Sequence, residues 1–233
     1  MPRSATALHL RRRRAASVIA ALAAALVLAA ARPARAQSDS QLWLEAGVSH
    51  DVGARVTLTF DQHLRFDEDV GRVAAIMPEP GVGVRAARWL RLGTSYRMQY
   101  ERNGNGDFEL RHRFHLIARA RVEPRRAVRV EYRLQLQEQV RPDANDTYRH
   151  SVRNRVAVEY RGLRPWRPGA SIELHHDLDN GDTVHLDKVW LTVGVARDLG
   201  ASEVELSYRA ELPQFDPDAP TVHILGLGYH VDL

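Results

Sequence analysis

The stretch FELRHRFHLIARARV, from Phe108 to Val122, alternates polar and apolar residues along most of its length, with His112 and Ile117 as the exceptions. Successive side chains point to opposite faces of a β-strand, so a period of two residues indicates a strand with two unlike faces. The stretch therefore predicts a β-strand that separates a polar environment from an apolar one. The polar face holds Arg111, Arg113, Arg119 and Arg121, and the apolar face holds Phe114, Leu116, Ala118 and Ala120.

The same alternation recurs along the rest of the chain. In RVTLTFDQHLRF, the face that carries Leu58 and Phe60 is apolar, and the face that carries Asp61 and Arg65 is polar. No segment keeps a helical period of about 3.6 residues. Eleven such segments can be counted, near residues 41–50, 54–66, 72–86, 90–101, 108–122, 127–140, 148–161, 168–178, 184–197, 202–212 and 221–233.

The connections between these segments are of two alternating types. One type is short, as in DVGA, ARW, EPRR, RPWRPG and DLGA. The other is acidic and rich in turn residues, as in DEDVG, NGNGD, RPDANDT, DNGD and PQFDPDAP. Consecutive hairpins with two different rims are typical of an up-and-down barrel. We therefore predict an all-β fold, an antiparallel up-and-down transmembrane β-barrel of roughly 10–12 strands over residues 37–233.

Residues 1–36 are predicted to form a cleaved signal peptide. Four consecutive arginines precede an apolar run, and the sequence ARA before Gln37 is typical of a cleavage site. These 36 residues hold seven arginines and no acid, so the formal net charge falls from +4 for the whole chain to −3 for the remainder. That balance does not support nucleic-acid binding. The chain has no cysteine, which excludes disulfides and cysteine-ligated metals.

The alternation fits either a membrane barrel with a charged lumen or a soluble periplasmic ligand-binding barrel with an apolar interior. The signal peptide, the segment lengths and the aromatic residues near segment ends favour the membrane. The last segment, HILGLGYHVDL, keeps its apolar parity to the end, and we predict an assembly signal at Tyr229, Val231 and Leu233. The predicted location is the bacterial outer membrane. Its lipids and the barrel assembly machinery are the predicted partners of a monomer.

In a membrane barrel the arginine-bearing faces should line the lumen, because an arginine at the lipid midplane costs roughly 2–4 kcal/mol. Two interpretations stay open: charges that pair across strands and fill a narrow lumen, or a small water-filled pore that prefers anions. The predicted function is accordingly structural or passive transport. The predicted lumen-lining residues are Arg111, Arg113, Arg119, Arg129, Arg133, Arg153, Arg155, Glu109, Glu131 and Glu159.

Four stretches carry a resemblance to a known family: QLWLEAGVSHDVG, LTFDQHLRFDED, RHRFHL and HILGLGYHVDL. They resemble the bacterial family catalogued as domain of unknown function 2490 (DUF2490), over nearly the whole chain after residue 36. The resemblance implies an outer-membrane β-barrel with no established activity. Its motifs are strand patterns, so it supplies no site residues.

An outer-membrane hydrolase of lipase or protease type is the alternative function. A lipase needs a serine beside a histidine, and no serine is predicted beside the polar residues on apolar faces, which are His112, Asn154 and His176. A rim protease needs acids and a histidine, for which the candidates are Asp67, Asp69, Asp146, Asp179, Asp182 and His150. Such acids are first of all turn residues, and nucleotide and calcium-hand motifs are absent. We predict no enzymatic activity, metal or cofactor.

The strand count conflicts with the usual topology. Bacterial single-chain barrels have an even number of strands, with short periplasmic turns. With the C-terminal strand ending in the periplasm, eleven segments put the start of the first strand outside the cell, where only Gln37–Ser40 precede it. Either one segment does not span the membrane, or two segments are merged, or the closure is unusual.

Overall fold

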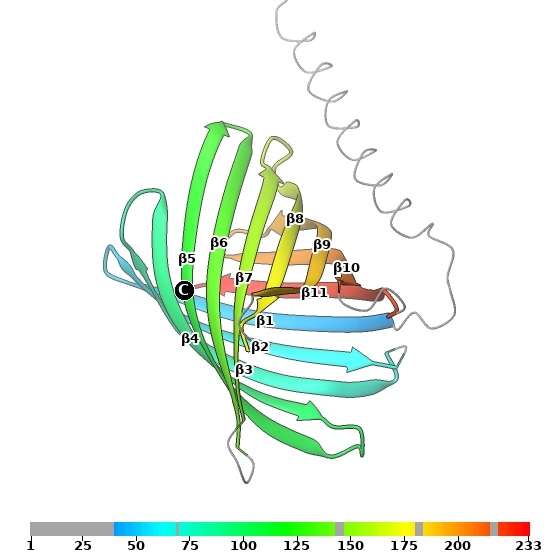
Figure 1. Ribbon diagram of the computed structural model, residues 1–233. Helices are drawn as coiled ribbons and strands as arrows, with labels where there is room; N and C mark the ends of the chain where they lie inside the picture. Colours follow the sequence, from blue (N-terminus) through cyan, green and yellow to red (C-terminus); the bar gives the residue numbers. More distant parts are fainter. Residues whose placement is uncertain (1–39, 69, 143–146, 180–183, 215–218) are drawn as a thin grey trace, which may run out of the picture.

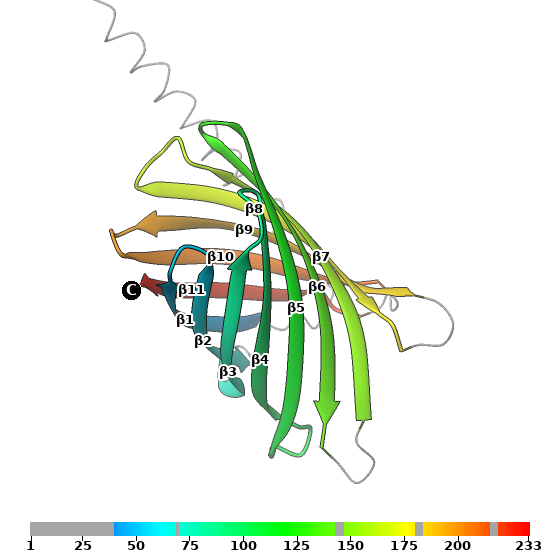
Figure 2. The same cartoon turned by 90° about the vertical axis from the view of Figure 1, so that its left-hand side faces the viewer.

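The computed structural model describes residues 40–68, 70–142, 147–179, 184–214 and 219–233. Within them the chain forms eleven β-strands that curve into one barrel (Figure 1, Figure 2). No helix in these ranges is long and apolar enough to cross a membrane. The strands are β1 Ser40–Val52, β2 Val56–Asp67, β3 Arg72–Arg85, β4 Leu90–Arg102, β5 Phe108–Arg125, β6 Val128–Arg141, β7 Thr147–Tyr160, β8 Trp166–Asp177, β9 His185–Asp198, β10 Ser202–Pro213 and β11 Val222–Asp232.

Each predicted segment corresponds to one strand, so the predicted all-β barrel is confirmed, with eleven strands. The stretch quoted first lies in β5, the longest strand at 18 residues. β5 runs to Arg125, past the predicted end at Val122, because it continues to pair with β6 through an irregularity between these two residues. A bulge of this kind lets a strand bend without losing its partner.

The barrel closes through one parallel pair of strands, whereas all its other neighbouring strands are antiparallel, as predicted. Neighbouring strands are antiparallel from β1 through to β11, whereas β1 and β11 run side by side in the same direction, from Ser40 opposite His223 to Ser49 opposite Asp232. An odd number of strands joined by consecutive hairpins can close only in this way. The unusual closure therefore resolves the conflict over the strand count.

The two rims of the barrel differ in their connections. The short connections at one rim are residues 53–55, 86–89, 126–127, 161–165 and 199–201, and the β11 terminus lies there. Gly53 and Gly200 adopt positive φ angles of 71° and 92° in two of these turns, a conformation that glycine adopts at little cost. The acidic, turn-rich connections, called the long connections below, lie at the other rim together with the start of β1, because β1 and β11 are parallel. Figure 1 shows the C-terminus on the left, away from the start of β1.

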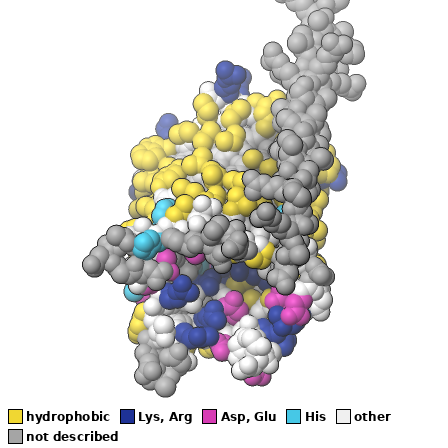
Figure 3. Space-filling view, turned by 45° about the vertical axis from the view of Figure 1, so that its right-hand side comes forward, with side chains coloured by type: hydrophobic (Ala, Val, Ile, Leu, Met, Phe, Trp, Pro, Cys, Tyr) yellow, Lys and Arg dark blue, Asp and Glu magenta, His cyan; other side chains and the backbone are white. Residues whose placement is uncertain are grey.

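The two faces of the barrel wall differ as the alternation predicts. On β5, Leu116 exposes 61% of its surface on the outside, whereas the adjacent His115 exposes 1% on the inside. Figure 3 shows hydrophobic side chains in a broad band over the outer wall, with lysine, arginine, aspartate and glutamate side chains gathered below it. The barrel therefore has an apolar exterior and a polar interior, the opposite of a soluble barrel that holds an apolar ligand.

Some polar side chains on the outer wall are bonded to tyrosine hydroxyls. The Tyr132 hydroxyl donates to Asn154 Oδ1 at 2.7 Å, and the Tyr96 hydroxyl lies 2.6 Å from His112 Nδ1. An unpaired polar group in apolar surroundings is costly, and these bonds reduce that cost. His176 also lies on this wall, and its Nδ1 has no hydrogen-bond partner among the described residues.

Candidate functional site in the barrel lumen

The first buried carboxylate of the lumen is Glu79 on β3, which exposes 8% of its surface. It accepts a hydrogen bond from Ser95 Oγ at 2.5 Å and forms an ion pair with Arg97. His115 Nδ1 lies 3.2 Å from its Oε1, and His63 Nε2 lies 3.6 Å from its Oε2. These partners stand on β2, β4 and β5, so one carboxylate joins four strands.

The second buried carboxylate is Glu173 on β8, which exposes 5% of its surface. Arg133 Nη2 on β6 donates to it at 2.8 Å, and Arg153 Nε on β7 donates at 2.6 Å. His175 Nε2 lies 3.1 Å away on the same strand. One carboxylate thus compensates two guanidinium groups, and this cluster fixes the positions of long side chains inside the lumen.

Two tryptophans and three arginines stack across the lumen. The rings of Trp43 on β1 and Trp190 on β9 meet edge to face, with centroids 5.5 Å apart. The Arg209 guanidinium lies 4.8 Å from the first ring and 4.4 Å from the second. Arg65 covers Trp43 at 3.8 Å, and Arg153 covers Trp190 at 5.0 Å. Aromatic faces attract cations, so this stack holds guanidinium groups in place largely without carboxylates.

The half of the lumen next to the long connections is filled by side chains. Met77, Gln99 and His115 expose 0%, 1% and 1% of their surface, and they stand on β3, β4 and β5. Gln139 on β6 and Asp177 on β8 are buried at the same end of the barrel. Side chains packed to this degree leave little room for a wide aqueous channel through this half.

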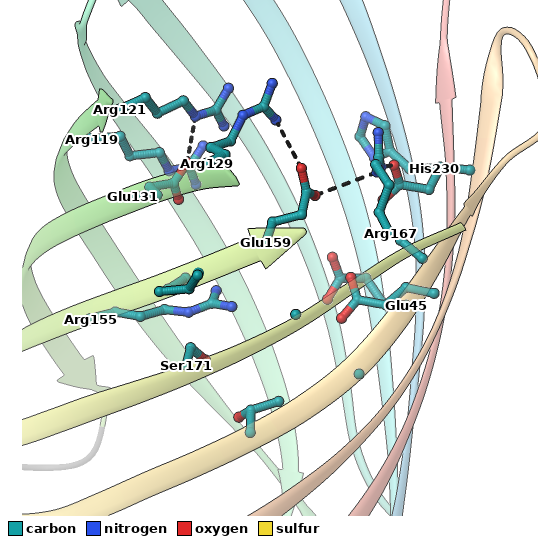
Figure 4. Close-up of a pocket in the computed structure, with 18 of the residues that line it drawn as sticks. Glu45, Arg119, Arg121, Arg129, Glu131, Arg155, Glu159, Arg167, Ser171 and His230 are labelled. Atoms are coloured by element: carbon teal, nitrogen blue, oxygen red, sulfur yellow. Dashed lines mark hydrogen bonds and ion pairs between the residues drawn. The ribbon is translucent and has the colours of Figure 1, made fainter. Parts of the chain in front are cut away.

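The half next to the short connections contains a cavity of about 610 Å³ (Figure 4). A second cavity, of about 310 Å³, reaches the tryptophan stack. Six residues line both cavities, so the two cavities adjoin at these side chains: Glu45, Asp61, Arg119, Arg155, Thr192 and Glu205. Small residues such as Gly169 and Gly194 line the larger cavity. In the packed half, by contrast, bulky side chains such as Met77, Gln99 and His115 fill the lumen. The lumen is therefore asymmetric along its axis.

The structure places the ten predicted lumen residues on the inner face of β5, β6 and β7, in different surroundings. Arg111 pairs with Glu101 and Glu109 near the long connections, while Arg129 pairs with Glu159 at 3.6 Å near the short ones. Glu131 pairs with Arg121. Arg133 and Arg153 belong to the Glu173 cluster.

The other predicted lumen arginines lack carboxylate partners among the described residues. Arg113 donates through Nε to Gln139 Oε1 at 2.6 Å and makes no ion pair. Arg119 and Arg155 make no ion pair with any residue that the structure describes, and both line the cavities. The inner face is thus partly a paired network and partly a set of uncompensated cations.

The predicted assembly-signal residues lie on the outer face of β11. Tyr229 is exposed, and Leu233, just beyond the strand, exposes 74% of its surface. Val231 shares their parity and pairs in register with Ser202 of β10. This placement gives the end of the chain an apolar outer edge, and recognition by an assembly machinery stays a prediction.

The rim acids considered for a protease form local contacts. Asp67 and Arg72 make a two-bond ion pair across the β2–β3 hairpin, at 3.0 Å for each bond. The Asp179 carboxylate lies 2.8 Å from His150 Nδ1. Burial opposes ionisation, but hydrogen bonds from His150 outweigh it and lower the pKa of Asp179. No group of three described histidine, aspartate or glutamate residues is arranged to hold a metal ion. The predicted candidates Asp69, Asp146 and Asp182 lie outside the described residues.

One cluster missed by the sequence analysis has the residue types of a hydrolytic triad. Ser95 Oγ lies 3.1 Å from His115 Nδ1, and Glu79 Oε1 lies 3.2 Å from the same nitrogen. A triad histidine instead uses one ring nitrogen for the nucleophile and the other for the acid. The serine and histidine are also buried. This arrangement suits a packed hydrogen-bond cluster. In the sequence, the alternation could have placed Ser95 inside the barrel, because Ser95 and Arg97 lie two residues apart on one strand and share its inner face.

Comparisons with known proteins give one match. A family model described as "Protein of unknown function (DUF2490)" matches residues 40–216. Comparison with curated proteins and with solved structures gives no match. The matched range includes β1 to β10, and therefore Glu79, Glu173 and the tryptophan stack.

Proposed function

The chain belongs to the DUF2490 family of proteins of unknown function, and on that premise we propose that it is an integral β-barrel of the bacterial outer membrane with a structural or passive-transport role. The observation that carries the proposal is the apolar outer wall. A partner protein would cover one side of a barrel, whereas only a surrounding lipid phase covers every side. Exposed hydrophobic residues occur on each strand from β2 to β11: Leu58, Val82, Leu92, Leu116, Leu136, Val156, Ile172, Leu191, Leu206 and Leu227.

Aromatic residues at both ends of this wall support the same proposal. Trp89 and Trp166 are exposed near the short connections, and Tyr100 and Tyr148 near the long ones. Tryptophan and tyrosine favour the level of lipid headgroups, where one part of the ring is apolar and another is wet. A signal peptide over residues 1–36, which lie outside the described residues, would deliver the chain to the envelope.

The packed half of the lumen favours a narrow barrel over a general diffusion pore. Eight strands enclose a space that side chains fill, and sixteen or more enclose an aqueous channel. In this barrel Glu79 and Glu173 gather cations into the lumen, and Met77 on β3 and Gln99 on β4 are buried there as well. The interpretation of a lumen filled by paired charges therefore has more support than the interpretation of an anion-preferring pore.

The proposal is tested by fractionation and by conductance. The protein should sediment with outer membranes, resist a urea wash, and show heat-modifiable migration in a gel. In a planar bilayer it should give little steady conductance. Recovery in the soluble periplasmic fraction would contradict the membrane location, and a large ohmic conductance would contradict the narrow lumen. Protease added to intact cells should cut PQFDPDAP and spare RPWRPG if the short connections are periplasmic.

A further inference from the structure

Four arginines form a row across four neighbouring strands. In register, Arg91 on β4 is opposite Arg119 on β5, which is opposite Arg133 on β6, which is opposite Arg155 on β7. Among the described residues, only Arg133 has an ion-pair partner, Glu173 at 2.8 Å. Like charges directly opposite each other destabilise a sheet. Three of the four arginines thus have no ion-pair partner among the described residues, so the row does not serve the stability of the barrel.

Carboxylates without arginine partners line the other side of the same space. Glu205 on β10 makes no ion pair with a described residue. Asp61 on β2 has one weak contact, with His230 Nδ1 at 4.0 Å. Glu45 on β1 lies 3.1 Å from His63 Nδ1. This wall therefore carries three carboxylates that make no ion pair with a guanidinium group among the described residues.

The two charged walls meet where the two cavities join. Arg119 and Arg155 line both cavities, as do Glu45, Asp61 and Glu205. In the barrel order, β5 is five strands from β10 and β7 is five strands from β2, the largest separation that eleven strands allow. Figure 4 shows Glu45 on the side of the pocket opposite Arg119 and Arg155. The junction is thus polarised across the lumen.

We propose that this junction binds a small water-soluble zwitterion. Its acidic group lies at Arg119 and Arg155, because guanidinium groups match carboxylate and phosphate oxygens through paired hydrogen bonds. Its ammonium group lies at Asp61 and Glu205, which accept hydrogen bonds from it. A ligand with one charge leaves the opposite wall uncompensated, whereas a zwitterion compensates both. The cavities, of about 610 and 310 Å³, have the size of small-ligand sites. This inference rests on the proposed function for the route by which a solute reaches the lumen.

The first test measures selectivity in the wild-type protein. The full barrel, purified in detergent, is titrated calorimetrically with 4-aminobutanoate, 6-aminohexanoate and 8-aminooctanoate. Hexanoate and hexylammonium are the singly charged controls. At least one aminocarboxylate should bind at least about tenfold more tightly than either control. Hexanoate binding as tightly as the zwitterions would make this a simple anion site and overturn the proposal, as would no binding at all.

The second test assigns each end of the ligand to a wall. Arg119→Gln with Arg155→Gln should weaken zwitterion binding about tenfold or more and leave hexylammonium binding unchanged. Asp61→Asn with Glu205→Gln should weaken it similarly and leave hexanoate binding unchanged. Arg149→Gln is the matched control, because its side chain is 65% exposed and lines neither cavity. If each double variant weakened the binding of hexanoate and of hexylammonium equally, the assignment of the two ends would be contradicted.

The outcomes separate the two proposals. If a double variant fails to give a heat-modifiable barrel, the selectivity of the wild type still decides the inference. The titration needs no membrane, so its failure leaves the fractionation and conductance tests of the proposed function untouched. Conversely, a protein that binds the zwitterion but fractionates as soluble would retain the site and lose the membrane location.

Discussion

Replacing Glu173 with glutamine removes the charge that holds two arginines inside the lumen. The glutamine has nearly the same shape, so the cavity and the packing remain, and the change isolates the charge. Arg133 and Arg153 then stay buried beside each other without a carboxylate, because the side chains of all three are shielded, with 17%, 13% and 6% of the Arg133, Arg153 and Glu173 side-chain surface exposed. We expect a large loss of barrel stability.

The magnitude follows from burial. Removing one partner of a buried ion pair costs roughly 3–5 kcal/mol, since the remaining charge is left uncompensated. Glu123 provides the control: its side chain is 50% exposed and pairs with Arg161 at 2.7 Å. An exposed pair contributes roughly 0–1 kcal/mol. At a urea dependence of about 2 kcal/mol/M, Glu173→Gln should lower the midpoint by about 2 M and Glu123→Gln by less than about 0.5 M.

The assay is urea unfolding of the barrel in lipid vesicles, followed by tryptophan fluorescence. One of the four tryptophans, Trp190, lies beside Arg153, so part of the signal reports the cluster. Adding Arg153→Gln to Glu173→Gln should restore part of the stability, because one uncompensated charge is removed. A midpoint shift for Glu173→Gln no larger than that for Glu123→Gln would refute the reasoning.

Three further predictions concern the outer wall. Deletion of Tyr229–Leu233 should block assembly, because the last strand loses its apolar edge; normal amounts of inserted truncated barrel would contradict the assembly signal. In this cysteine-free chain, Arg119→Cys should react with a charged thiol reagent and Leu116→Cys only with a lipid-soluble one; reversed labelling would indicate an inverted, soluble barrel. Tyr132→Phe should lower the free energy of unfolding by about 1 kcal/mol, because the Asn154 amide loses its partner, and adding Asn154→Leu should restore it; unchanged urea midpoints would argue against this bond.

Alternation in the sequence was sufficient to predict the strands and their faces. A strand turns its side chains by half a turn per residue, so parity alone separates Leu116 outside from His115 inside. The count of eleven segments also implies the parallel closure, because an odd number of strands joined by consecutive hairpins can close in no other way. What made the count hard to accept was the even number usual in bacterial barrels.

Pairing inside the lumen could not be predicted, because it depends on register and on strands far apart in the sequence. Arg209 on β10 reaches Trp43 on β1, although β11 stands between these strands. Irregularities in register at Arg65 and at His175 shift which side chains share a level. Parity predicted that Arg119 and Arg153 share the inner face, but only the assembled barrel shows which of them has a carboxylate partner.

The parallel pairing of β1 with β11 limits circular permutation of this chain. In an even-stranded barrel the two termini meet at one rim, and a short splice yields a circular permutant. Here the ends are separated by the height of the wall. Thirteen residues of β1 at about 3.4 Å each, tilted by about 40°, span roughly 34 Å. A linker that joins the end of β11 to the start of β1 would need about ten extended residues. It would have to pass through the charged interior or along the apolar exterior, so a circular permutant of this barrel is hard to make.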